Sequence, residues 1–118
     1  MNFDFSEEQK LIKKTISEFV QREIKPIVNK MERENYFPYE IIKKLGQLGT
    51  LGGYANNIDT ISSCIIIEEI SKVSPAIGVI ISVHNTLVCN GIYEFGNEER
   101  RWDIKRKSEN FLYCWGKT

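Results

Sequence analysis

The chain has 118 residues, of which 42% are hydrophobic and 27% charged, and its 16 basic side chains balance 16 acidic ones. This length fits a single domain, and the composition is typical of a globular protein and not of a disordered one. Because the net charge is zero and Asp103 and Glu109 interrupt the basic residues near the end of the chain, we expect no nucleic-acid partner.

The first predicted helix follows a capping box at Ser6 and Gln9, in which each side chain bonds the backbone N–H of the other residue. Apolar residues then recur at helical spacing as far as Ile24. Pro26 has no N–H to donate to the helical ladder, so we expect a kink or a restart there. A short second helix is predicted as far as about Arg33.

A third helix is predicted from about Tyr39 to Leu48. It follows Phe37-Pro38, because the residue before a proline avoids helical geometry. Glycines then end the helix and let the chain turn. The side chains expected on its buried face are Ile41, Ile42, Leu45 and Leu48.

A fourth helix is predicted up to Ser71, with Asp59 or Thr60 as its N-cap. Its run of isoleucines is also compatible with a buried strand, but the cap and the acidic pair Glu68-Glu69 favour a helix. The side chains expected in the core are Ile61, Cys64, Ile65, Ile66, Ile67 and Ile70.

The fifth predicted helix begins at Ser74-Pro75, ends at Gly96, and carries a long stretch without charged residues from Val73 to Tyr93. This stretch is about long enough to span a membrane, which takes ~20 apolar residues. Its polar residues would be costly at the bilayer centre, so we expect no membrane span and favour a helix nearly surrounded by a bundle. Asn97 is expected to cap a short sixth helix. The predicted fold is all-α, a bundle of about five to six helices.

The cysteines Cys64, Cys89 and Cys114 are odd in number and far apart, which argues against a disulfide framework or a zinc site. Cys64 and Cys89 lie in apolar stretches and are expected to be small buried hydrophobes. The first residues are acidic and unlike a signal peptide, so the predicted compartment is the cytoplasm.

No complete catalytic site emerges from the residues alone. His84 is the only histidine and has apolar neighbours one turn away, whereas a catalytic base needs an orienting partner and a metal site several ligands. We expect His84 to be a satisfied core residue. Glu68 and Glu69 diverge by about 100° on a helix, so one is expected to be exposed and the other interfacial. The glycine-rich segment 49–53 lacks the spacing of a phosphate loop.

Two blocks of short motifs in a fixed order carry a family resemblance. The first block holds the capping box, E-I-x-P and F-P before K-L-G-x-L-G, and the second holds E-E-I, S-V-H-N and F-G-x-E-E. Together they cover about four-fifths of the chain. This order resembles the N-terminal helical domain of the acyl-CoA dehydrogenase family. The segments concerned are Ser6–Gln9, Glu23–Pro26, Phe37–Pro38, Lys44–Gly49, Glu68–Ile70, Ser82–Asn85 and Phe95–Glu99.

The resemblance implies a division into a helical domain, residues 1–101, and a divergent tail, residues 102–118. In the family, FAD and the acyl-CoA lie between this domain, a β-domain and a second helical domain, and both of those domains are expected to be missing from a truncated chain. The implied reaction is α,β-dehydrogenation of an acyl-CoA thioester, with a base from the C-terminal domain and hydride transfer to the flavin. FAD is thus implied by family only. We expect no catalytic, cofactor-binding or metal-binding residue here, and no activity from the chain alone.

By the same resemblance, Ser82, His84, Asn85 and Thr86 match a stretch near the acyl tail and are the candidate substrate-binding residues. The sequence departs from the family pattern in two places. The loop from Gly52 to Asn57 is shorter than the family's P-E-x-Y-G-G-x-G loop. The tail from Trp102 replaces the expected flavin-contacting segment, and its residues 111–115 are a candidate vestigial strand.

An alternative function is a helical homo-oligomerisation or protein-interaction module that keeps the fold without catalysis. The expected partners are a second copy or a separately encoded remainder of the enzyme, with acyl-CoA by family only. Without the family's other domains, apolar side chains on and beyond the fifth helix should be exposed. They are Val79, Val83, Leu87 or Tyr93, together with Phe111, Leu112 and Trp115.

Overall fold

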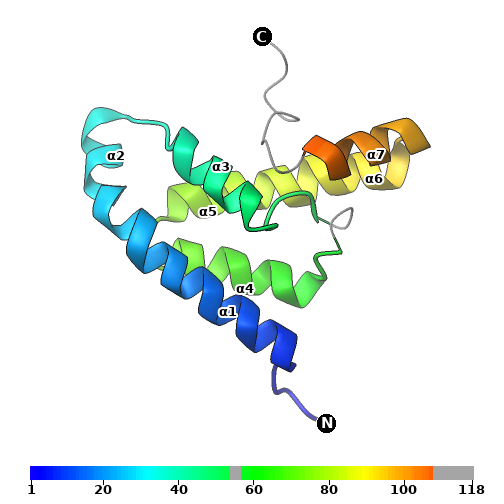
Figure 1. Ribbon diagram of the computed structural model, residues 1–118, viewed down its shortest axis with the longest axis horizontal. Coiled ribbons are helices and arrows are strands. Elements are labelled where there is room, and N and C mark those ends of the chain that lie inside the picture. Colours follow the sequence, from blue (N-terminus) through cyan, green and yellow to red (C-terminus); the bar gives the residue numbers. More distant parts are fainter. Residues whose placement is uncertain (54–56, 108–118) are drawn as a thin grey trace.

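The computed structural model describes residues 1–53 and 57–107, and the fold is all-α, as predicted (Figure 1). Within these ranges no residue forms a strand. Each of the six helices expected from the sequence is present, although two of them are composite.

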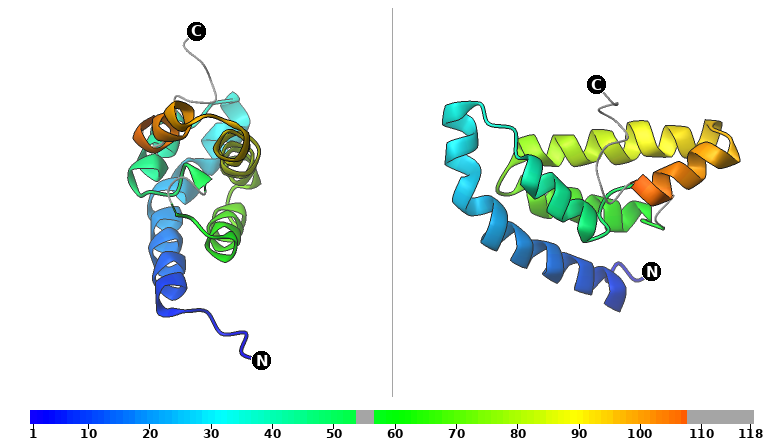
Figure 2. Two further views of the ribbon diagram at one scale, coloured as in Figure 1. Left: turned by 90° about the vertical axis from the view of Figure 1, so that its right-hand side faces the viewer. Right: turned by 45° about the horizontal axis from the view of Figure 1, so that its top comes forward.

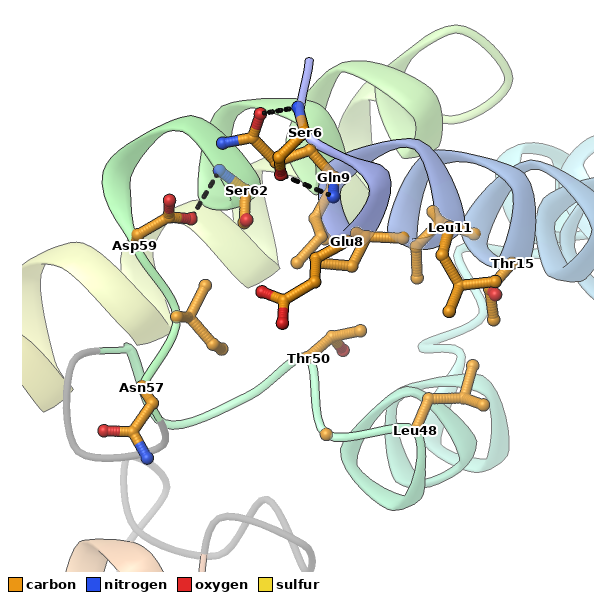
Figure 3. Close-up of a pocket in the computed structure, with 15 residues that line it drawn as sticks. Ser6, Glu8, Gln9, Leu11, Thr15, Leu48, Thr50, Asn57, Asp59 and Ser62 are labelled. Atoms are coloured by element: carbon orange, nitrogen blue, oxygen red, sulfur yellow. Dashed lines mark hydrogen bonds between the residues drawn. The ribbon is translucent and has the colours of Figure 1, made fainter.

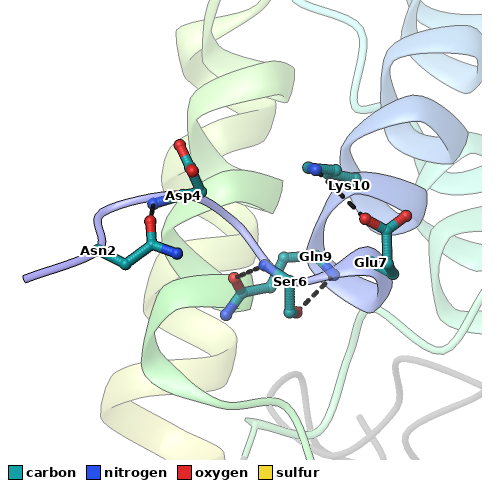
Figure 4. A network of polar contacts seen from close by, with 6 residues as sticks. All are labelled: Asn2, Asp4, Ser6, Glu7, Gln9 and Lys10. Atoms are coloured by element: carbon teal, nitrogen blue, oxygen red, sulfur yellow. Dashed lines mark hydrogen bonds and ion pairs between the residues drawn. The ribbon is translucent and has the colours of Figure 1, made fainter.

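The first helix, α1 (Glu7–Phe19), begins at the capping box that the sequence predicts (Figure 4). The Ser6 N–H donates to Gln9 Oε1 at 2.9 Å, and the Gln9 N–H donates to Ser6 Oγ at 3.2 Å. Two N–H groups at the start of the helix that have no partner within it are satisfied in this way. Glu7 and Lys10 add an exposed ion pair at 3.2 Å, a kind of pair that contributes little to stability.

The predicted restart around Pro26 takes three steps. The wide π-helical turn η1 (Val20–Ile24) follows α1, the 3-10 turn η2 (Lys25–Ile27) contains the proline, and α2 (Val28–Glu34) resumes the α-helix. The Lys25 N–H donates to Val20 O, five residues back. A proline ring clashes with the carbonyl one turn earlier, which accounts for the widened ladder ahead of it.

The next helix, α3 (Tyr39–Gln47), buries Ile41, Ile42 and Leu45 as expected. The prediction for Leu48 is wrong, since this side chain is 44% exposed. Leu48 is the C-cap, where the chain leaves the helix towards Gly49.

The fourth helix, α4 (Thr60–Ser71), is capped by Asp59, whose Oδ1 accepts from the Ser62 N–H at 2.9 Å. Cys64 and Ile61 are exposed, contrary to prediction, and Ile67 is half-buried. A helix buries residues three and four apart on one face. In α4 the face that packs on the core does not include positions 61 and 64. The buried stripe is Ser62, Ile65, Ile66, Glu69 and Ile70.

The acidic pair separates as predicted, with Glu68 exposed and Glu69 buried. Glu69 lies between two amines: Oε1 is 2.7 Å from Lys72 Nζ and 3.9 Å from Lys13 Nζ. Lys13 belongs to α1, which packs along α4 (Figure 2). A buried carboxylate needs such partners, so this group also helps to fix α1 on α4.

Helix α5 (Pro75–Ser82) packs against α4 and starts at Ser74, whose Oγ accepts from the Ile77 N–H at 3.3 Å. It continues without interruption through the π-helical η4 (Val83–Cys89) into α6 (Asn90–Phe95). Gly78 lies against Ser71, and a Cβ there would collide with the serine side chain. Glycine at position 78 therefore lets α4 and α5 approach closely without a change in the Ser71 side chain.

The helix from Pro75 to Phe95 is the one among the described residues that is long and apolar enough to cross a membrane by length and composition, with a mean hydropathy of 1.4. A core helix passes the same test, so this is weak evidence for a span. The prediction that this helix is nearly surrounded is wrong: only 33% of its most apolar window is buried.

The last helix, α7 (Glu98–Lys107), packs back against α6 (Figure 1). As predicted, Asn97 caps it, with Oδ1 accepting from the Arg100 N–H at 3.0 Å. Arg101 Nε donates to Tyr93 O at 2.6 Å and joins the two helices. The division at residues 101 and 102 stays a prediction, and residues 111–115 lie outside the described part of the chain.

Candidate functional site

The four candidate substrate-binding residues lie around the junction of α5 and η4, but they do not face one site. His84 and Asn85 are buried, each 2% exposed, whereas Ser82 is half-buried and Thr86 is exposed. His84 and Asn85 therefore face the core, whereas Ser82 and Thr86 lie nearer the surface of the helix.

Asn85 connects η4 to the glycine-rich segment that follows α3. Its Oδ1 accepts from the Gly52 N–H at 3.0 Å, and its Nδ2 donates to Thr50 O at 2.8 Å. Both ends of the amide are therefore used by backbone groups more than 30 residues away. This arrangement gives Asn85 a structural role, and its role in substrate binding stays a prediction. We call the contact between Asn85 and the segment 49–53 the loop clamp.

Gly53 completes the loop clamp. Its φ of 56° is in the left-handed region, where glycine is preferred. A Cβ at this position would also meet the Asn90 side chain and the Asn85 carbonyl oxygen. The glycines of this segment therefore serve close packing on the helix. Because the Gly52 N–H is already engaged, the prediction that the segment is not a phosphate loop is consistent with its geometry.

His84 contacts the thiol of Cys89, with Nε2 at 3.4 Å from Sγ, and both side chains are buried. Desolvation lowers the pKa of His84 to about 4, so the ring is neutral near pH 7. Cys89 is a small buried residue, as expected, and Cys64 is not. Among residues 1–53 and 57–107, no group of three His, Cys, Asp or Glu side chains is arranged to hold a metal ion.

The outer side of the same helix is apolar. Val79, Val83 and Leu87 are 61%, 43% and 70% exposed, and Thr86 lies beside them with its hydroxyl donating to Ser82 O at 2.6 Å. We call these four residues the outer face. No Asp, Glu, Lys or Arg occurs from Pro75 to Tyr93. The outer face can therefore cover an apolar ligand or protein surface, but it offers no acid or base.

A groove of about 530 Å³ lies where α1, α4 and the end of α3 meet, and the sequence did not reveal it (Figure 3). Glu8 points into it from α1, and Thr50 lies at its floor near Leu48. The hydrogen bonds with Ser62 lower the pKa of Asp59, the N-cap at its edge. The caps Ser6 and Asp59 were each predictable, but their convergence at one groove is a tertiary feature. The groove holds no paired nucleophile and base.

Comparison with known proteins agrees with this fold and with the motif order. Residues 6–104 match the family model described as "Acyl-CoA dehydrogenase, N-terminal domain". A helical domain of this class is the fold that α1 to α7 define. The chain belongs to the acyl-CoA dehydrogenase family.

Individual relatives are much longer than the segment that matches this chain. An acyl-CoA dehydrogenase of Bacillus subtilis is 39% identical over 103 residues, which are 81% of this chain and 27% of the relative. A short-chain specific acyl-CoA dehydrogenase of Clostridium acetobutylicum is 38% identical over 108 residues, 86% of this chain and 28% of the relative. The chain therefore spans less than a third of the length of these relatives.

A solved structure shares the fold, with a TM-score of 0.84 and 27% identity. It is described as "Electron transferring flavoprotein of Acidaminococcus fermentans: Towards a mechanism of flavin-based electron bifurcation". The similarity covers 92% of this chain and 30% of the other.

The expectation that this chain has no cofactor-binding residue stays a prediction. A dinucleotide needs free backbone donors at its pyrophosphate, and the glycine-rich segment directs its Gly52 N–H to Asn85. The outer face adds no charged group. FAD is thus implied by the family alone.

Proposed function

We propose that this chain serves as the helical N-terminal part of an FAD-dependent acyl-CoA dehydrogenase and that the outer face forms one wall of the acyl-binding site. The observation that carries the proposal is the uncharged, exposed surface of Val79, Val83 and Leu87 on a helix of a family member. An acyl chain is best covered by such apolar side chains, since each removes hydrocarbon surface from water.

The proposal gives the four candidate residues different roles. Thr86 and Ser82 are the two near enough to the surface to border an acyl chain, whereas His84 and Asn85 hold the helix and the loop behind it. The reaction, removal of two hydrogens from the Cα–Cβ bond of the thioester, requires a base and FAD from further polypeptide. That polypeptide is either a continuation of this chain or a separate one.

The test of this assignment uses the purified 118-residue chain. We expect it to retain no flavin after gel filtration with FAD, and to reduce no electron-accepting dye when given FAD and a short-chain acyl-CoA. Stoichiometric flavin absorbance that survives gel filtration, or dye reduction that depends on the acyl-CoA, would overturn the proposed dependence on further polypeptide.

A second candidate function is a homo-oligomerisation or interaction module that uses the same fold without catalysis. The observation that favours it is also the outer face, because contiguous exposed apolar surface usually marks an interface. The two functions differ in what they require: the first needs further polypeptide, and the second needs a partner on the outer face of the chain as it is.

A further inference from the structure

We propose that the loop clamp holds η4 in its π-helical register and that Asn85 thereby positions the outer face for an acyl chain. The second half of this inference rests on the proposed function, which places the acyl chain on the outer face. Three observations carry it. The π-helical turn has no proline to cause it, the loop clamp contacts two residues that are five apart, and the outer face extends across the point where the register changes.

The turn η4 lacks the local cause that explains the other π-helical turn. η1 ends at Ile24, two residues before Pro26, and the proline ring accounts for its widened ladder. η4 runs from Val83 to Cys89, and no proline follows Pro75 in the sequence. π-Helical turns are rare and occur mostly as single turns within α-helices. The widened ladder of η4 therefore needs a contact from elsewhere in the fold to hold it.

Residues five apart come together on η4. At about 100° per residue, positions five apart lie about 140° apart around an α-helix, and so on different faces. On η4, however, His84 Nε2 is 3.4 Å from Cys89 Sγ. The Asn90 N–H donates to Asn85 O, also five residues back. Both contacts depend on the wider turn, which brings residues i and i+5 into line.

The glycine-rich segment of the loop clamp lies against this same turn. The Asn85 side chain bonds the Gly52 N–H and Thr50 O. Gly53 lies so close to the helix that a Cβ would meet both the Asn85 carbonyl oxygen and the Asn90 side chain. One short stretch of backbone thus contacts positions 85 and 90 together. An α-helical ladder would carry these positions to different faces, so the loop clamp favours the π-helical register.

The outer face extends across the point at which the register changes. Val79 lies on α5, whereas Val83, Thr86 and Leu87 lie on η4. In a continuous α-helix, positions eight apart lie about 80° apart around the axis, and the wider turn of η4 reduces this angle. The π-helical register therefore brings Leu87 more nearly into line with Val79. It determines whether the exposed side chains form one continuous apolar surface.

Asn85 is on this account a positioning residue, because it acts on the acyl chain only through the side chains of the outer face. An apolar wall contacts the acyl chain equally in the bound substrate and in the transition state. Loss of such uniform binding raises KM and leaves kcat unchanged. A kinetic effect on KM alone is therefore the expected signature of the loop clamp.

NMR spectroscopy of the 118-residue chain tests the register. We expect contacts between the His84 ring and the Cys89 side-chain protons in the parent chain, and their loss in Asn85→Ala. The matched control is Ile66→Ala, which truncates a buried residue of α4. It should destabilise the chain to a similar extent and leave these contacts unchanged. Circular dichroism checks that both variants are folded.

Thiol labelling gives a second measurement of the register. In a background with Cys64→Ser and Cys114→Ser, the buried Cys89 thiol should react at least ~10-fold faster in Asn85→Ala than in Ile66→Ala. The reason is that local opening of η4 exposes the thiol without global unfolding. Gly53→Ala crowds the same contact while it keeps the Asn85 amide, and it should also weaken the contacts between residues 84 and 89.

A hybrid enzyme tests the positioning role. In it, residues 6–104 of this chain replace the matching segment of the Bacillus subtilis acyl-CoA dehydrogenase. Asn85→Ala in the hybrid should raise KM for a short-chain acyl-CoA ~10-fold and leave kcat within about twofold. Ile66→Ala, the control, should change neither constant by more than about twofold.

Contacts between residues 84 and 89 that are absent from the parent chain, or that persist in folded Asn85→Ala and Gly53→Ala, would overturn the claim about the register. An unchanged KM in the Asn85→Ala hybrid would overturn the positioning role. A hybrid of the parent sequence that shows no turnover would refute the proposed function, and the positioning role with it. The NMR result does not depend on turnover, so the two failures are distinguishable.

Discussion

Replacing Asn85 by alanine removes the loop clamp and should be among the most destabilising single changes in the chain. The side chain is 2% exposed and bonds the Gly52 N–H and Thr50 O from a helix more than 30 residues away in sequence. In Asn85→Ala both backbone groups lose their partner. Because they are covered by the helix, water can replace the amide only if the loop moves away.

The magnitude follows from the two orphaned groups. An unsatisfied buried donor or acceptor costs about 1–3 kcal/mol, so we expect the free energy of unfolding to fall by ~2–4 kcal/mol. A domain has only about 5–15 kcal/mol in total, and this loss is therefore a large share. With a urea dependence of ~2 kcal/mol per M, the middle of the range for small domains, the unfolding midpoint should fall by about 1–2 M.

Urea unfolding followed by far-UV circular dichroism measures this effect. The matched control is Thr86→Ala at the next residue, where the hydroxyl is exposed and bonds only Ser82 O within the same helix. It should change the stability by less than about 0.5 kcal/mol. Asn85→Asp keeps an acceptor for the Gly52 N–H but loses the donor to Thr50 O. Its unfolding midpoint should therefore fall as it does in Asn85→Ala. If Asn85→Ala unfolds at the same urea concentration as Thr86→Ala, the loop clamp is not a stabilising contact.

The remaining predictions concern pH and the glycines. Burial lowers the pKa of His84 to about 4, below its ordinary 6.5. The stability that the neutral ring contributes is therefore complete above pH 6.5, and up to about 3 kcal/mol of it is lost as the pH falls towards 4. His84→Leu should make the unfolding midpoint less dependent on pH over this range, and an unchanged pH dependence would refute the linkage. Gly53→Ala should destabilise by more than Gly49→Ala, because both have positive φ but only position 53 is closed by Asn90 and the Asn85 carbonyl. Equal midpoints for the two variants would contradict the crowding at Gly53.

The features that the sequence predicts well depend on a few neighbouring residues. The capping box at Ser6, the caps at Asp59 and Asn97, and the restart at Pro26 are all present. Each cap joins one side chain to the backbone three residues away, and the restart follows from the proline ring itself, so the surrounding fold does not change the result.

The wrong predictions concern choices that depend on the fold. All positions of α4 from Cys64 to Ile67 are apolar, so the sequence does not tell which stripe faces the core, and the structure buries Ser62 and Glu69 in place of Cys64. The role of Asn85 was missed for the same reason. Its partners in the segment 49–53 come near it only when α3 and η4 are packed together.

The most direct test of the central claim is a hybrid enzyme in which residues 6–104 of this chain replace the matching segment of the Bacillus subtilis acyl-CoA dehydrogenase. If these residues serve as the N-terminal part of such an enzyme, the hybrid should bind FAD and oxidise an acyl-CoA, whereas the 118-residue chain alone should do neither. The parent enzyme is the control. A hybrid that folds and holds its flavin but shows no turnover, or turnover by the 118-residue chain alone, would contradict the account.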